Sequence, residues 1–114
     1  MPSATTPKPP AHLSPAAAIF FKQVVADYEL EPSHLRLLTL LCESADRGTL
    51  AREALAEHGL TYLDRFGSPH ARPEVAIARD ATVAVVRISR ELDLDADAIA
   101  LPTRPPALAS NRRN

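Results

Sequence analysis

The sequence contains very few of the residues that build disulfides and phosphate-binding loops. It has one cysteine, Cys42, so no internal disulfide can form, which agrees with a reducing compartment. It has only three glycines, and none belongs to a Walker-type or dinucleotide-binding pattern. We therefore expect no phosphate-cradling loop and no nucleotide cofactor.

The chain also lacks a charge excess of one sign and long apolar runs. Thirteen Lys and Arg residues face fourteen Asp and Glu residues, so the net charge is −1 and no global basic field attracts nucleic acid. No apolar run approaches the roughly 20 residues that span a bilayer. The N-terminus has no hydrophobic core of the signal-peptide type. These absences predict a soluble, cytoplasmic protein with no membrane partner.

Residues of the kind that bind metals or catalyse reactions are not clustered in the sequence. None of the four histidines has a partner at zinc-site spacing: His12, His34, His58 and His70. Cys42 lies among leucines on an apolar helical stripe, which predicts an inert core thiol. Asp93, Asp95 and Asp97 match the first ligands of a calcium loop, but Ala98 and Arg104 stand where Gly and Glu are required. We expect no metal, no cofactor and no enzymatic activity.

Proline marks the ends of the chain. Eight of the eleven prolines lie in residues 2–15 and 102–106. This pattern predicts a disordered proline-rich leader over residues 1–13, a helical domain over 14–100 and a flexible basic tail over 101–114. A domain of this size has a thin core, and such domains often gain stability by forming oligomers.

The central domain is predicted to be all-α, with three main helices at about Pro15–Tyr28, Ser33–His58 and Pro73–Leu92. Ser14 and Ser33 are the expected N-caps of the first two helices, and Gly59 suits a left-handed position after the second. Gly48 lies inside the second helix, where glycine costs only about 1 kcal/mol against alanine, so one long helix bent near Gly48 is expected. Residues 60–72 join the last two helices as a loop or a short β-hairpin.

The third predicted helix carries a wide apolar stripe. Residues three and four positions apart form it: Ala78, Ala81, Val85, Ile88 and Leu92, widened by Val75, Ile77 and Val86. A wide stripe with small side chains suits close packing on two neighbours. These neighbours are either other helices of this chain or further copies of it.

The basic residues are the candidates for contact with nucleic acid. The set comprises Lys22, Arg36, Arg65, Arg72, Arg79 and Arg90. Arg72, Arg79 and Arg90 share one helical face, and the planar arginine fork suits phosphate contact. The alternative is ordinary surface pairing, with Arg47 on Glu43 and Arg87 on Glu91 four residues apart. Scattered weak contacts would add up only in an oligomer.

The order of these features resembles the short, all-helical kind of phage terminase small subunit. The resemblance covers residues 13–97: a Leu-Ser-Pro entry, a second helix ending in Glu-His-Gly-Leu, an Arg-Pro-Glu-Val entry, an Ile-Ala-Arg-Asp-Ala core and a closing Arg-Glu-Leu-Asp-Leu-Asp. In that family the last helix commonly follows His-Pro, where this chain has Arg72-Pro73. The family commonly closes on Glu-Leu-Gly-Leu-x-Pro, where this chain has Asp93 for the glycine and Ala96 for the proline.

The resemblance implies a non-catalytic genome-packaging factor of a bacteriophage. Its members form homo-oligomeric rings, bind double-stranded viral DNA and hand it to the terminase large subunit, an ATPase and nuclease. The implied site of action is the host cytoplasm. The helices over 31–58 and 73–92 would form the oligomerising hairpin, with the stripe of Ala78, Ala81, Val85, Ile88 and Leu92 facing neighbouring subunits. The tail, with Arg104, Arg112 and Arg113, would dock the large subunit.

A second hypothesis fits the near-zero net charge. The chain could be a small helical protein-interaction module, such as an antitoxin or adaptor, that never touches DNA.

Overall fold

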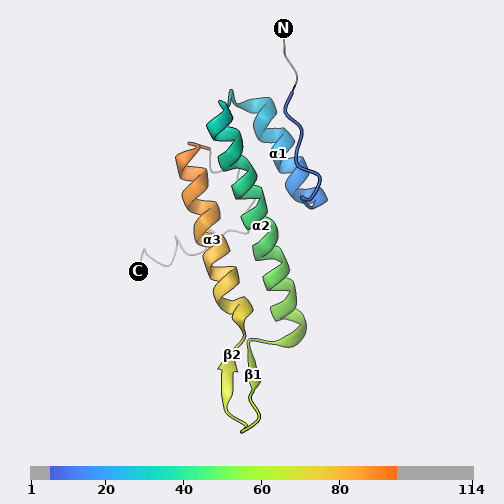
Figure 1. Cartoon of the computed structure of the whole chain (residues 1–114), viewed down its shortest axis with the longest axis vertical. Coiled ribbons are helices and arrows are strands. Elements are labelled where there is room, and N and C mark those ends of the chain that lie inside the picture. The colour runs from blue at the N-terminus through green and yellow to red at the C-terminus, as the bar shows by residue number, and fades with distance from the viewer. Residues whose placement is uncertain (1–5, 95–114) are drawn as a thin grey trace, which may run out of the picture.

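The computed structural model describes residues 6–94, which form three helices and one β-hairpin (Figure 1). The helices are α1 (Pro15–Asp27), α2 (Pro32–His58) and α3 (Pro73–Glu91). Between α2 and α3, β1 (Thr61–Leu63) pairs antiparallel with β2 (Pro69–Ala71), with Tyr62 opposite His70. The prediction of a mostly helical fold with three helices is confirmed, and the segment joining the last two helices is a hairpin rather than a loop.

The helices run up, down and up. α1 lies beside the N-terminal half of α2, α3 runs along the other side of α2, and the hairpin projects beyond the far end of this pair (Figure 1). None of the helices among the described residues is long and apolar enough to cross a membrane.

Each helix begins with a proline, whose missing N–H needs no partner in a first turn. Ser14 caps α1 as predicted, because its Oγ accepts a hydrogen bond from Ala17 N at 3.1 Å. The expected cap of α2 at Ser33 is wrong, since the helix begins at Pro32 and Glu31 is its N-cap. There the backbone N–H of Glu31 donates to Nδ1 of His34 at 3.3 Å.

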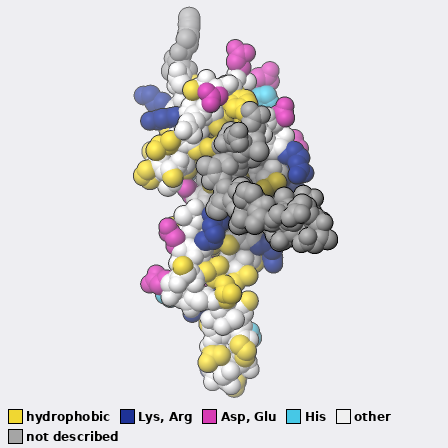
Figure 2. Space-filling model, turned by 180° about the vertical axis from the view of Figure 1, so that it is seen from behind, with side chains coloured by type: hydrophobic (Ala, Val, Ile, Leu, Met, Phe, Trp, Pro, Cys, Tyr) yellow, Lys and Arg dark blue, Asp and Glu magenta, His cyan; other side chains and the backbone are white. Residues whose placement is uncertain are grey.

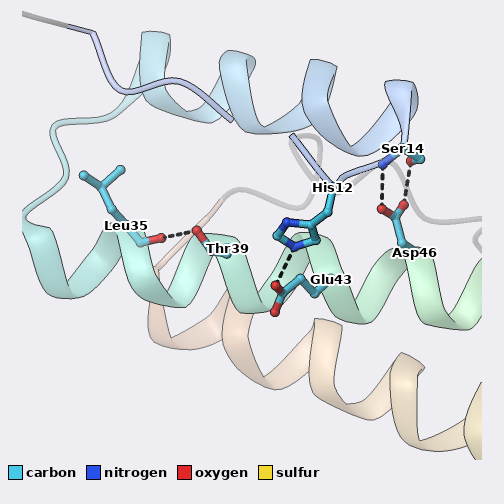
Figure 3. A network of polar contacts seen from close by, with 6 residues as sticks. All are labelled: His12, Ser14, Leu35, Thr39, Glu43 and Asp46. Atoms are coloured by element: carbon cyan, nitrogen blue, oxygen red, sulfur yellow. Dashed lines mark hydrogen bonds and ion pairs between the residues drawn. The ribbon is translucent and has the colours of Figure 1, made fainter. Parts of the chain in front are cut away.

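The segment before α1 is tied to α2 by polar contacts (Figure 3). Ser14 donates to Asp46 twice, from Oγ at 2.6 Å and from the backbone N–H at 2.8 Å. His12 Nε2 lies 2.7 Å from a carboxylate oxygen of Glu43. Leu13 is buried in the core. These contacts join residues 12–14 to α2, so the end of the predicted leader lies against the helical domain.

The core lies where the three helices meet. It consists of buried side chains from α1, α2, the segment before α1 and the end of α3: Leu13, Ala17, Phe21, Val24, Leu38, Leu41, Cys42 and Leu92. Burying one such side chain contributes about 1.5–3 kcal/mol. Partly buried side chains, among them Ile88 and Leu94, pack against this cluster.

The packing of α2 against α3 depends on small side chains where the two helices come closest. A Cβ atom added at Gly48 would lie 3.0 Å from Cβ of Ala81, closer than the roughly 3.5–4.0 Å at which carbon atoms pack best. Ala81 and Ala51 are themselves buried. In the sequence, Gly48 indicated only a small loss of helix stability relative to alanine. The structure shows a packing role, because any side chain at Gly48 would require α3 to shift away from α2. The helix α2 continues through Gly48 without interruption.

The end of α3 shows why glycine suits the position at which this chain has Asp93. Asp93 has φ +57°, a left-handed conformation that favours glycine. The N–H of Leu94 donates to the carbonyl of Ser89 at 3.1 Å, and that of Asp93 to Arg90 at 3.1 Å. This six-to-one and five-to-two pattern is a Schellman motif, which usually has glycine at this position. Glycine is therefore the residue that the local backbone prefers here.

Gly48→Val tests the close approach of α2 and α3. Two extra methyl groups and a β-carbon must push α3 away, so the free energy of unfolding should fall by about 1–3 kcal/mol in a urea titration. Ala56→Val is the control, because Ala56 is exposed on the same helix and its change should stay near about 0.5 kcal/mol. Equal stability of the two variants would contradict the packing role of Gly48.

Asp93→Gly tests the strained end of α3. Relief of the left-handed conformation should raise the free energy of unfolding by about 1 kcal/mol, measured by thermal or urea unfolding. Asp80→Gly, within α3 itself, should instead lower it by about 0.3 kcal/mol, the difference between the two helix propensities. A loss of stability in Asp93→Gly would show that the aspartate side chain itself stabilises the turn.

Candidate nucleic-acid interface

The predicted row of arginines lies on the face of α3 that points away from α2. Arg72, Arg79 and Arg90 fall within about 20° of one another around the helix, and Arg72 to Arg90 spans about 27 Å along it. Arg79 and Arg90 are exposed and Arg72 is half-buried. The structure thus brings these three residues onto one face, as the spacing predicted.

Two valines that the sequence analysis did not assign to this face complete it. Val83 is 49% exposed and Val86 is 39% exposed, and they follow Arg79 at four and seven positions. We call Arg79, Val83, Val86 and Arg90 the α3 outer row. Val86 was expected to widen the buried stripe. It points away instead, and the i, i+4, i+7 spacing from Arg79 was the signal for this.

The predicted apolar stripe of α3 is largely used within the chain. Ala81, Val85 and Leu92 are buried, whereas Ala78 and Ile88 are half-buried at the edges. The reason is that α2 runs along this side of α3 and its small residues let the stripe pack closely. A second copy could therefore reach this stripe only at its edge residues and where Ala81 and Val85 line an opening between the helices.

The other predicted basic residues lie apart from this row. Lys22 is exposed on α1, Arg36 is exposed near the start of α2, and Arg65 is at the hairpin turn. Figure 2 shows Lys and Arg side chains at several separate places on the face it displays, with apolar side chains between them. On the face that Figure 2 shows, the positive charges of the described residues are therefore dispersed and do not form a continuous patch.

The surface pairs offered as the alternative for two arginines do not form within residues 6–94. The Glu43 carboxylate binds His12 rather than Arg47, and no ion pair joins Arg87 to Glu91. Arg79 lies 3.5 Å from the exposed carboxylate of its neighbour Asp80, a contact that contributes little in water. Arg79 therefore keeps its capacity for phosphate contact.

The hairpin turn is organised by one carboxylate. Asp64 accepts hydrogen bonds from the backbone N–H groups of Phe66 at 2.8 Å and Ser68 at 2.9 Å, and from His70 Nε2 at 2.8 Å. The bond from His70, with those from the backbone, holds the pKa of Asp64 below its ordinary value of 3.8. The ring of Tyr62 stacks on His70 with centroids 5.5 Å apart.

Cys42 is a core residue, as expected. It is fully buried, and Sγ lies 3.7 Å from the carbonyl oxygen of Ala17. Burial, with the nearby carboxylates of Asp46 and Glu43, raises the pKa of Cys42 from 9.0 to about 12. Among the described residues no three His, Cys, Asp or Glu side chains are placed to share a metal ion. Part of the Asp93–Asp97 calcium pattern lies outside those residues.

The fold is that of a small helical protein, and the exposed side chains of the α3 outer row suit contact with a partner molecule. The family model described as phage terminase, small subunit, matches residues 20–102, well over half of the chain. The chain therefore belongs to the phage terminase small-subunit family, which confirms the resemblance seen in the sequence. A search of curated proteins and a search of solved structures each returned no match.

The buried thiol predicts a specific pH behaviour. At pH 8 Cys42 should not react with an aromatic disulfide reagent in the native protein but should react fully in urea, because the folded state favours the protonated, covered form. Since the folded pKa is the higher one, this stabilisation is complete below pH 9 and is lost as the pH rises from 9 towards 12. Rapid native reaction at pH 8 would contradict this placement.

Proposed function

We propose that this chain is the DNA-recognition and adaptor subunit of a phage packaging terminase. In this proposal it acts in the host cytoplasm as a homo-oligomeric ring, binds double-stranded viral DNA and recruits the large ATPase and nuclease subunit. The observation that carries the proposal is the family match over residues 20–102, which includes most of α1 and all of α2, the hairpin and α3.

The α3 outer row is the proposed DNA-contacting surface, together with Lys22, Arg36, Arg65 and Arg72. Arginine at Arg79 and Arg90 suits phosphate contact, and the valines between them offer apolar surface to the same partner or to a neighbouring subunit. Because one copy carries few dispersed charges and a net charge of −1, useful affinity requires several copies acting together. The proposed DNA binding and the proposed oligomer therefore support each other.

The proposed subunit contacts extend beyond the stripe expected from the sequence. Ala78 and Ile88 remain available at its edges, and Ile77, Val83 and Val86 are exposed on the same helix. The proposed docking residues for the large subunit, Arg104, Arg112 and Arg113, lie outside the described residues. Family members are generally non-catalytic, so we infer that this subunit has no enzymatic activity and that the large subunit carries the chemistry.

A helical interaction module without DNA binding is the second candidate. The separate positions of the basic side chains in Figure 2 and the near-zero net charge favour it. The two proposals differ in whether DNA retention depends on the arginine row.

The double variant Arg79→Ala and Arg90→Ala tests the row. Binding to double-stranded DNA, measured by fluorescence anisotropy over a range of salt concentrations, should weaken because fewer phosphates are neutralised. The slope of log affinity against log salt should fall by about 0.9 for each phosphate that the variant no longer neutralises. The double variant Lys8→Ala and Arg47→Ala, which removes two exposed cations outside the row, is the control and should bind like the wild type. Equal binding by both variants, or no binding by the wild type at low salt, would favour the second candidate.

A further inference from the structure

The hairpin between α2 and α3 exposes an unusual amount of apolar surface. Leu63 is 68% exposed and Phe66 is 78% exposed, and every residue of both strands is exposed. We call Leu60, Tyr62, Leu63 and Phe66 the hairpin knob. An isolated two-stranded hairpin is at best marginally stable in water, and apolar surface of this kind marks an interaction site. The hairpin therefore needs a partner that covers it.

The same chain carries an apolar groove where α1, α2 and α3 meet. We call it the three-helix groove, and its volume is about 640 Å³. Leu41, Ala45 and Gly48 of α2 line it, with Phe20 of α1 and Ala81 and Val85 of α3. The small side chains of Ala45, Gly48 and Ala81 leave room in it for large side chains of a partner, as apolar pockets of this size do.

The charges around the two surfaces are complementary. The guanidinium of Arg65 lies 5.0 Å from the centroid of the Phe66 ring, so a cation accompanies the knob. Two carboxylates, Asp46 and Glu53, line the groove beside one arginine, Arg52. An aromatic knob with an adjacent cation thus matches an apolar groove that carries two carboxylates. Such complementarity selects the register of a contact.

We propose that the hairpin knob of one copy inserts Phe66 and Leu63 into the three-helix groove of the next copy. This rests on the proposed homo-oligomer and specifies how its subunits meet. The hairpin cannot reach the groove of its own chain, because it projects beyond the ends of α2 and α3, at the opposite end of the molecule from α1 (Figure 1). Each copy then donates one knob and accepts one, a head-to-tail contact that closes into a ring when the rotation between copies allows it.

Cysteine cross-linking tests the pairing between knob and groove. In a full-length Cys42→Ala background, Phe66→Cys combined with Ala45→Cys should form disulfides between copies under mild oxidation. Head-to-tail contact gives a ladder of dimers, trimers and larger species, whereas a symmetric contact stops at dimers. Phe66→Cys with Ile19→Cys is the control, because Ile19 is readily accessible, at 58% exposure, but does not line the groove. A ladder no stronger than that of the control overturns the groove assignment.

A mass measurement separates this inference from the proposed function. By light scattering, Phe66→Asp should raise the concentration at which the oligomer dissociates roughly tenfold or more, because a desolvated aromatic anchor is removed. Leu40→Asp changes an exposed leucine outside the knob and groove and should keep the wild-type mass. An unchanged mass in Phe66→Asp overturns the knob while leaving the oligomer intact. If this variant keeps its mass but no longer binds DNA, the hairpin contacts DNA and the inference is wrong. A monomeric wild type overturns both proposals.

Discussion

The close approach of α2 and α3 at Gly48 and Ala81 is the constraint on which the rest of the molecule depends. Without a side chain at Gly48, α3 lies near enough to bury Ala81 and Val85 on its inner side. Because the inner side of α3 is fixed in this way, its outer row of Arg79, Val83, Val86 and Arg90 must face away from α2. The same small side chains line the groove beside α1. One missing β-carbon thus helps set both surfaces that we assign to partners.

Helix positions could be predicted closely because prolines mark their beginnings. Pro15 and Pro73 fixed two starts, whereas Pro32 was interpreted as a break before α2 although it is that helix's first residue. The tie between Ser14 and Asp46 could not be predicted, because the two residues are 32 positions apart and no pattern in sequence links them. The same holds for His12, whose bond to Glu43 replaced the expected pair with Arg47.

The candidate site was predictable where it follows from helical periodicity. The spacing of Arg72, Arg79 and Arg90 gave their common face correctly. The stripe through Ala81, Val85 and Leu92 was also found. Periodicity indicates that such a face is buried, but it does not identify the segment that packs against it. Its residues pack mostly within the chain, so the surfaces left for other copies are the outer row, the hairpin and the groove that Ala81 and Val85 help to line. The exposure of Phe66 was invisible in the sequence, because an aromatic residue beside a turn can be either buried or exposed.

The up, down and up arrangement also bears on the order of events in assembly. Short connections, residues 28–31 and 59–72, place each helix next to the one that follows it in the chain, so most native contacts join segments that are near in sequence. Topologies of this kind fold rapidly. A newly made chain can therefore complete its own interior before it meets another copy. Assembly then becomes an encounter between folded chains, and its rate depends on their concentration.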